Sequence, residues 1–253
     1  MSSAKSALKV LEIVAKNPRV TLHELVQLLD EPKTTTYRHL NELLETGWLI
    51  SEGEGRNRRW VVSPKLTVLA HLSRSPFNLR NAALPIMEEL RELSGESVHL
   101  VVAEHREVVL IERLDSPQAL RAVRPIGGRM LMHATSTGKA ILAFSSNDRL
   151  QRYLKSPLEQ VTPNTIVDTE TLLMELELIR ERGFATNNGE MDAQVRAAAA
   201  VLFTGNLEPA ASISISGPSV RISDAKLEAY GKLVRDTTQK FDTRPYPTLK
   251  PGR

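Results

Sequence analysis

The chain of 253 residues contains no cysteine. This absence excludes a disulfide framework, a thiolate metal site and a thiol nucleophile. Long apolar runs are missing as well. No stretch approaches the roughly 18 uncharged apolar residues that a membrane span needs, and the N-terminal MSSAKSALKV is not a signal peptide. We therefore expect a soluble cytoplasmic protein with no membrane partner.

Excess charge of one sign is small and unevenly placed. The formal net charge is +3; residues 1–75 hold 11 Lys and Arg against 8 Asp and Glu, and the remaining residues hold 22 of each. The positive excess therefore lies in the first third, which permits a nucleic-acid partner there. A hydrophobic fraction of 41% over this length indicates one large globular domain or two smaller ones.

The first 62 residues have the pattern of three short helices followed by a hairpin. Apolar spacing predicts a helix over about residues 4–16, and Thr21 with Glu24 forms a capping box that opens the second helix. Pro32 suits the first turn of a third helix, and Gly47 ends it. After Gly47 the helical spacing of apolar residues ends. Two β-prone runs around a Gly-rich tip follow, in WLISEGEGRNRRWVVS. This order predicts a winged helix-turn-helix whose hairpin is the wing.

Three consecutive threonines stand at the start of the third helix, in EPKTTTYRHL. Threonine is a weak helix former, because its β-branched side chain is crowded against the preceding turn. In a winged helix these turns face the major groove, where hydroxyls bond phosphates or base edges and arginine reads guanine. Thr34, Thr35 and Arg38 share one face, and we expect Tyr37 to face the core. The alternative is an ordinary solvated helix.

The predicted DNA contacts belong to this helix and to the wing. They are Lys33, Thr34, Thr35, Thr36, Arg38 and His39 in the helix, with Arg56, Arg58 and Arg59 in the wing.

Enzyme motifs begin in several places and remain incomplete. HELVQ at 23–27 lacks the second histidine of a zinc-protease helix, and GEGRNR at 53–58 lacks the last glycine of a dinucleotide loop. STGKA at 136–140 resembles part of a phosphate loop, but His133 stands where its first glycine is required. No G-x-S-x-G nucleophile elbow occurs. We expect no catalytic residue, no cofactor and no metal, and hence no enzyme.

Beyond the wing, strands in hairpin-like groups alternate with helices. Strands are predicted in SVHLVVAEHREVVLIERLD, near ALRAVRPIGG at 119–128, and in ATNNGEMDAQVRAAAAVLF and AASISISG. Helices packed around such groups indicate an α+β fold. The predicted division is a winged helix-turn-helix domain at 1–62, a linker helix at 63–76, a second domain at 77–245 and a C-terminal tail at 246–253.

Nearly the whole chain resembles the IclR family of bacterial transcriptional regulators. SALKVLEIV, TLHELVQLLDEPKTTTYRHLNELLETGWL and the wing match the family's DNA-binding domain. RPIGGRMLMHATSTGKAILA, IRERGFATNNGEMDAQVRAAAAVLF and AASISISGP look like its effector-domain segments. The resemblance implies a GAF-like/profilin-like effector-binding domain, a linking helix, and homodimers that often pair into tetramers. It also implies a ligand-responsive regulator of a metabolic or catabolic operon, and we expect a repressor. A dimer would read near-palindromic operator DNA.

The resemblance also carries over an effector pocket by position. Its residues would be Met130, Ser136 and Thr137 on one side, Asn187, Val195 and Ala197 on another, and Ser214 and Ser216 on the last strand. In SISIS, the serines alternate with isoleucines and therefore share one face of a strand. The alternative is a serine face that meets water.

The pocket sequence departs from the family at four positions. Asn187 and Ala197 stand where many members carry an acidic residue and a cysteine, and Gln194 and Val201 replace a usual glycine and proline. Without the thiol and the carboxylate, the pocket is less polar and repels an anion less. We therefore expect a small organic acid as effector. Two other functions stay open: a small-molecule-processing enzyme with an accessory winged helix, and an effector-independent repressor.

Overall fold

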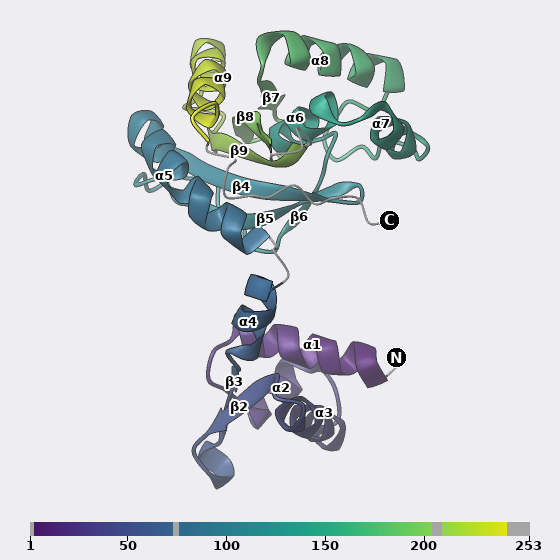
Figure 1. The fold of residues 1–253 in the computed structure, drawn as a ribbon, viewed down its shortest axis with the longest axis vertical. Helices are drawn as coiled ribbons and strands as arrows, with labels where there is room; N and C mark the ends of the chain where they lie inside the picture. The colour runs from purple at the N-terminus through teal and green to yellow at the C-terminus, as the bar shows by residue number, and fades with distance from the viewer. Residues whose placement is uncertain (1–2, 73–75, 204–208, 242–253) are drawn as a thin grey trace. The chain divides into compact units, whose positions relative to one another are not determined.

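The computed structural model describes residues 3–72, 76–203 and 209–241 (Figure 1). The chain divides into two compact units, Met1–Ser75 and Pro76–Arg253. Separate hydrophobic cores form in the two units, so each can be described by itself. The predicted tail at 246–253 lies outside the described residues.

The first unit is a winged helix-turn-helix. Its elements are α1 Ser3–Lys16, β1 Val20–Thr21, α2 Leu22–Leu29, α3 Lys33–Glu45, β2 Leu49–Glu52, a 3-10 turn at Gly55–Asn57, β3 Arg59–Val62 and α4 Lys65–Leu72. The strands form an antiparallel sheet in the order β1-β3-β2, in which Trp60 pairs with both Val20 and Ser51. Val10, Leu25 and Leu40 from the three helices pack with Trp60 in one core. The sequence pattern predicts every element of this unit except the two-residue strand β1 and the 3-10 turn at Gly55–Asn57.

The second unit is an antiparallel sheet between two layers of helices. Its elements are α5 Pro76–Ser94, β4 Ser97–Glu104, β5 Glu107–Leu114, β6 Arg129–Leu131, α6 Ser136–Phe144, α7 Asn147–Leu154, α8 Thr169–Arg182, β7 Ala185–Asn188, β8 Val195–Phe203, β9 Pro209–Pro218 and α9 Asp224–Thr238. The strand order is β6-β5-β4-β9-β8-β7, with every pair antiparallel. The predicted α+β class, with a GAF-like second domain, is confirmed.

Alternation along the central strands assigns their side chains to the two layers. Leu100 and Ile213 face the helices α5 and α9, and Val101 and Ala199 face α6, α7 and α8 (Figure 1). Both layers exclude water from the sheet. The serines of β9 share a face, as predicted. Ser212, Ser214 and Ser216 are all buried, so this face does not meet water, as the alternative had it.

Two predicted boundaries differ from the structure. No strand forms over 119–128, and β6 begins at Arg129. Pro125 has no N–H to give to a strand ladder, and Gly127 has a positive φ of 81°, which a strand does not accommodate. The predicted linker helix at 63–76 begins later in the structure, with α4 at Lys65–Leu72; residues 73–75 lie outside the described residues, and α5 begins at Pro76. Proline at a first helical position explains that start.

Candidate nucleic-acid interface and ligand cavity

Local hydrogen bonds and backbone geometry define both ends of α2. The Thr21 hydroxyl accepts from the backbone N–H of Glu24 at 3.3 Å, and the Thr21 N–H donates to the Glu24 carboxylate at 2.7 Å. The predicted capping box is thus confirmed, and its hydrogen bonds lower the pKa of Glu24. Asp30 ends α2 with a φ of 52°. A tight turn therefore leads directly into α3.

The inward face of α3 corrects part of the predicted DNA contact set. Thr36 and His39 are buried: with Leu40 and Leu43 they occupy positions i, i+3, i+4 and i+7 on one face of the helix. The Thr36 hydroxyl donates to the carbonyl of Pro32 at 3.3 Å, and the His39 Nδ1 pairs with Glu42 at 3.0 Å. The prediction that Thr36 and His39 face DNA is therefore wrong. The spacing of Leu40 and Leu43 indicates that positions 36 and 39 face the core, but threonine and histidine are not typical core residues.

The outward face of α3 contains Lys33, Thr34, Tyr37 and Arg38, all exposed, while Thr35 is half-buried. Tyr37, expected in the core, is 41% exposed. Arg38 makes only a loose pair with Glu42, at 3.8 Å, so its guanidinium keeps free donors. The first N–H groups of α3 add partial positive charge beside Lys33. This face can bind phosphates and base edges.

The wing arginines differ in how firmly they are held. Arg58 lies over the Trp60 ring at 4.4 Å and donates to Ser51 at 3.0 Å. Arg59 is exposed and donates to the carbonyl of Arg19 at 3.0 Å. The backbone of Arg56 lies in the turn at Gly55–Asn57, and its side chain is outside the described set. Arg58 is thus fixed to the hairpin.

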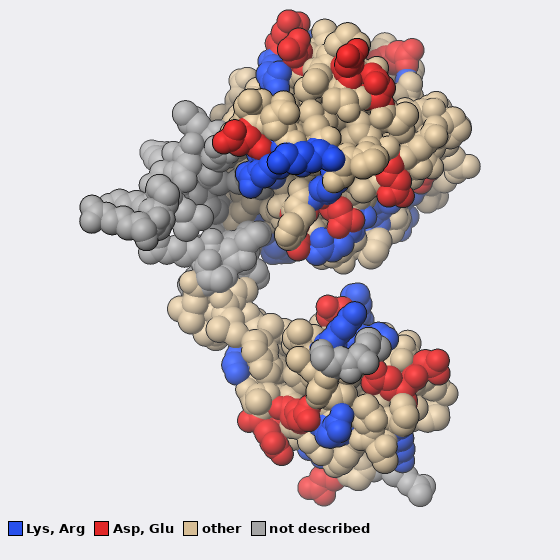
Figure 2. Space-filling view, turned by 90° about the vertical axis from the view of Figure 1, so that its right-hand side faces the viewer, with Lys and Arg blue, Asp and Glu red and all other residues tan. Residues whose placement is uncertain are grey.

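Charge alone does not distinguish the surface formed by α3 and the wing from the rest of the protein. On the face seen in Figure 2, basic and acidic side chains are interspersed on both units. The candidate interface therefore rests on the shape of the turn, on the exposed residues of α3 and on the wing.

The second unit contains a cavity of about 450 Å³ on the α6 side of the sheet. All eight positions of the predicted pocket line it, together with six others. The eight are Met130, Ser136, Thr137, Asn187, Val195, Ala197, Ser214 and Ser216; the six are His99, Val101, Arg124, Thr135, Met191 and Asp192.

The start of α6 forms one wall of the cavity. Thr135 caps the helix by accepting from the N–H of Gly138 at 3.1 Å. The helix N-terminus, with Ser136 and Thr137 in its first turn, therefore presents positive potential to the cavity. On the facing strand β9, the hydroxyls of Ser214 and Ser216 make no hydrogen bond to any described residue. These hydroxyls are free for a ligand.

Asn187 is buried and shapes the cavity through its own hydrogen bonds. Its amide nitrogen donates to the carbonyl of Ala134 at 2.5 Å, and its oxygen accepts from the N–H groups of Gly189 and Glu190 at 3.1 and 3.3 Å. The side chain thus ties the segment before α6 to the turn after β7. An aspartate here would place a carboxylate against the Ala134 carbonyl, so the amide suits this position.

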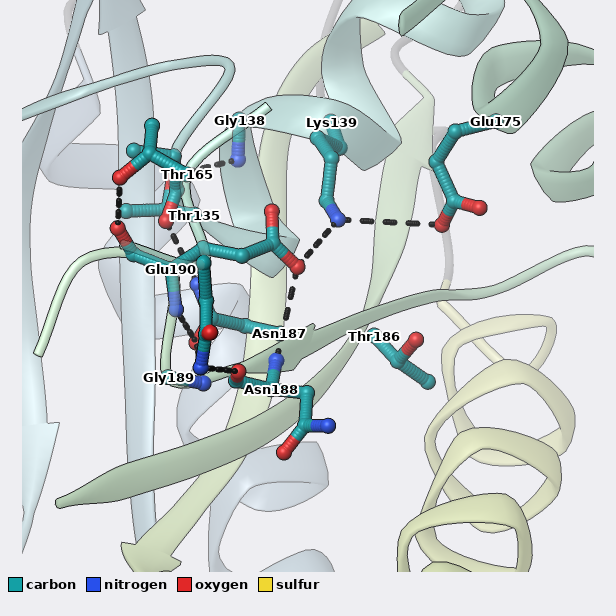
Figure 3. Close-up of polar contacts among 12 residues, drawn as sticks. Thr135, Gly138, Lys139, Thr165, Glu175, Thr186, Asn187, Asn188, Gly189 and Glu190 are labelled. Carbon is teal, nitrogen blue, oxygen red and sulfur yellow. Dashed lines mark hydrogen bonds and ion pairs between the residues drawn. The ribbon is translucent and has the colours of Figure 1, made fainter. Parts of the chain in front are cut away.

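A buried ion pair lies behind this wall. Figure 3 shows Lys139 reaching from α6 to Glu190, with Glu175 on the other side of its ammonium group. The Lys139 Nζ is 2.7 Å from Glu190 and 3.7 Å from Glu175, and Arg182 pairs with Glu175 at 2.8 Å. Burial raises the pKa of Glu190, and Lys139 counters that effect. In STGKA, the lysine is therefore a structural cation and not a phosphate ligand.

His99 and Arg124 are the cavity residues of most chemical interest that the sequence did not indicate. His99 lies on β4, paired in register with Ser214 of β9 and Arg113 of β5. It is buried, and its Nε2 has no hydrogen-bond partner among the described residues. Arg124 comes from the irregular loop before β6, and its guanidinium is 4.0 Å from Asp192. Alternation along β4 places His99 on the same face as Val101, and the pairing of β4 with β9 makes this the serine face.

Acidification is expected to reduce the stability of this unit through His99. Burial, with the positive charges of Arg124 and Arg113, lowers the pKa of His99 from 6.5 to about 4. Between these values the unfolded chain binds a proton that the native protein does not. The free energy of unfolding should therefore fall by up to about 3 kcal/mol as the pH drops through this window.

The measurement is urea unfolding of the wild type and His99→Asn at about pH 7 and about pH 4.5. The variant should lose less stability on acidification, because it carries no titrating group there. Equal losses in the two proteins would contradict a neutral buried His99.

Two kinds of feature were not found in the described ranges. Their His, Asp and Glu side chains form no group of three or more that could hold a metal ion. No helix in residues 3–72, 76–203 or 209–241 combines the length and the apolar character needed to cross a membrane.

Together the two units define a ligand-responsive DNA-binding regulator: a winged helix-turn-helix and a separate sheet domain with a cavity lined by polar and apolar side chains. Two family models match the chain. One is described as the IclR helix-turn-helix domain, over residues 3–52, and the other as the bacterial transcriptional regulator IclR C-terminal domain, over residues 71–243. The chain belongs to the IclR family of bacterial transcriptional regulators.

Relatives and solved structures agree with this assignment. The HTH-type transcriptional regulator BhcR of Paracoccus denitrificans is 34% identical over 93% of this chain and 84% of its own length. The transcriptional repressor IclR of Escherichia coli is 32% identical over 92% of this chain and 86% of its own length. The crystal structure of Thermotoga maritima IclR has a TM-score of 0.77 at 29% identity, covering 98% of this chain and all of that one.

One solved neighbour carries a ligand. An IclR homolog from Microbacterium hydrocarbonoxydans, crystallised with 4-hydroxybenzoate, has a TM-score of 0.75 at 25% identity, covering 94% of this chain and 96% of that one.

Proposed function

We propose that the outward face of α3 reads operator DNA in the major groove, and that a small organic acid bound in the cavity sets the affinity for that operator. The observation that carries this proposal is the gathering of all eight predicted pocket positions around one cavity. For the effector to act, it must bind one arrangement of the paired DNA-binding units better than another. The protein then works as a repressor of a metabolic or catabolic operon.

The chemistry of the cavity supports an organic acid. Arg124 and the α6 N-terminus supply positive potential, and Ser214 and Ser216 supply free hydroxyls. Apolar side chains, among them Val101, complete the lining and suit an aliphatic or aromatic body. A neighbouring structure with 4-hydroxybenzoate has a ligand of this class. No catalytic residue is proposed, since the relatives are named as regulators and repressors.

We further propose that copies of the chain pair, so that two α3 helices bind two half-sites of a near-palindrome. Helix-turn-helix dimers place such helices about one turn of DNA apart. Dimers that pair again into tetramers would bring two such sites together.

The experiment that tests the function is fluorescence anisotropy with the DNA upstream of the protein's own gene and of the neighbouring operon. A scrambled duplex and two salt concentrations complete the design. Tight binding that prefers the native sequence and weakens steeply with salt is expected, because phosphate contacts release counterions. Lack of binding to either duplex at low salt would contradict the proposal.

Arg38→Ala is expected to weaken operator binding by about 1–3 kcal/mol, since Arg38 is the exposed cation one turn into α3. Anisotropy titrations on the operator and on single-base variants measure this loss. A base contact predicts relaxed specificity at one position, and a phosphate contact predicts an equal loss on every duplex. The matched control is Arg152→Ala, which removes an exposed arginine from α7 and should leave operator affinity unchanged.

A further inference from the structure

His99 is a buried polar side chain whose hydrogen-bonding capacity the protein does not use. Its ring lines the cavity, its exposed fraction is 7%, and its Nε2 has no partner among the described residues. A buried nitrogen left without a hydrogen bond destabilises the protein, so such groups are rare unless a ligand or water bonds them. The adjacent Ser214, opposite it on β9, also has a free hydroxyl. These two groups therefore place unused hydrogen-bonding atoms next to each other in the cavity lining.

The charged groups around His99 come from three segments. Arg113 of β5 and Arg124 of the following loop are positive, and both act on the imidazole. Asp115, just after β5, pairs with Arg113 at 2.7 Å, and Asp192, on the turn between β7 and β8, is 4.0 Å from Arg124. Arg113 is thus neutralised by a close partner, whereas Arg124 is not. The loosely paired Arg124 is therefore the cation that can bind an anion inside the cavity.

We propose that His99 and Arg124 together bind the carboxylate of a monocarboxylate effector, and that His99 takes up a proton from solvent when this carboxylate binds. The inference rests on the proposed function of the cavity and names the effector class and the residues that select it. A carboxylate between the two side chains replaces the repulsion from Arg124 with attraction for an imidazolium. Asp192 on the same wall disfavours a second negative charge on the effector.

Proton uptake gives the cavity a measurable signature. In the protein alone His99 is neutral, with a pKa of about 4. The bound carboxylate raises this pKa, so binding consumes protons wherever the pH lies between the two values. Affinity for the effector then rises as the pH falls, by up to about tenfold per pH unit.

The test is isothermal titration calorimetry on the full-length protein without DNA. The ligands are 4-hydroxybenzoate, benzoate and pyruvate, each beside its neutral amide. Titrations in two buffers of different ionisation heat, at about pH 5.5 and about pH 7.5, count the protons taken up. Wild type should bind at least one acid better than its amide, take up a fraction of a proton, and bind more tightly at the lower pH. His99→Asn should bind that acid with no proton uptake and no gain at low pH.

Ser214→Ala is the matched control. It removes a hydroxyl from the same cavity and should weaken the same acid while keeping its proton uptake. Equal proton uptake by wild type and His99→Asn would overturn the role of His99 and leave the organic-acid function standing. Binding of amides in preference to acids, or of no compound, would overturn both.

Discussion

Lys139→Met is expected to lower the free energy of unfolding of the second unit by about 3–5 kcal/mol. Lys139 is 1% exposed, and Glu190 beside it is also buried, with one carboxylate oxygen unpartnered among the described residues. Removing the ammonium group leaves the Glu190 charge buried without compensation, and Glu175 nearby adds repulsion. Methionine has similar length and no charge, so the loss isolates the electrostatic contribution.

The two units can be followed separately in one denaturation experiment. Both tryptophans, Trp48 and Trp60, lie in the first unit, so their fluorescence reports the winged helix, whereas circular dichroism reports both units. The variant should shift the circular dichroism transition and leave the tryptophan transition in place. The double variant Lys139→Met, Glu190→Met should recover most of the loss, because an apolar pair replaces a buried ion pair at little cost.

The loss of stability in Lys139→Met should also depend on pH, and the sign of this dependence can be stated. Without Lys139, the pKa of Glu190 rises further above that of the unfolded chain, so the native state binds more protons in that window. Stability then increases as the pH falls, and the deficit of the variant should shrink on acidification. A deficit below about 1 kcal/mol, or one independent of pH, would show that the pair is not tightly coupled.

Gly138→Ala is expected to destabilise the second unit by about 3 kcal/mol, although helix propensity alone predicts the opposite. Gly138 lies in the first turn of α6 without a positive φ, so alanine suits its backbone and would favour the helix by up to about 1 kcal/mol. A Cβ at this position, however, would lie 2.3 Å from both the Cα and the carbonyl oxygen of Met132. Backbone atoms cannot rotate away, so α6 must move.

The sign of the change therefore decides between the two effects. Thermal unfolding should show a lower midpoint for Gly138→Ala, and effector binding should weaken because Ser136 and Thr137 move with the helix. Gly95→Ala is a useful comparison: its φ is 68°, but its Cβ would meet open space, so only modest backbone strain is expected. A Gly138→Ala protein as stable as wild type would mean that α6 and Met132 pack less closely than described.

Local patterns in the sequence were sufficient to predict those elements whose structure depends on their own residues. The Thr21 capping box, the hairpin and the helix order of the winged domain follow from short-range rules. The rotation of α3 about its axis did not follow, because Thr36 and His39 are core residues only when the rest of the domain packs on them. Tyr37 was misplaced for the same reason.

The cavity shows a similar limit. Family resemblance located eight of its lining positions, and spacing along β9 placed the serines on one face. His99 was missed because it is remote in sequence from those segments, and only the pairing of β4 with β9 brings it opposite Ser214. Arg124 is the first residue of the segment RPIGGRMLMHATSTGKAILA, but its place in the cavity lining depends on the irregular loop before β6. Arg124 also lies in the range 119–128, where a strand was predicted and the structure has an irregular loop.

The order of the six-stranded sheet restricts how copies of this chain can assemble. Its two edges are β6 and β7, of three and four residues, while the longer strands lie inside. A short edge offers few free backbone N–H and carbonyl groups to a strand from another molecule. Continuous sheets across subunits, and the runaway strand addition that leads to fibrils, are thereby disfavoured. The pairing of copies proposed above should therefore use side chains on helices and loops.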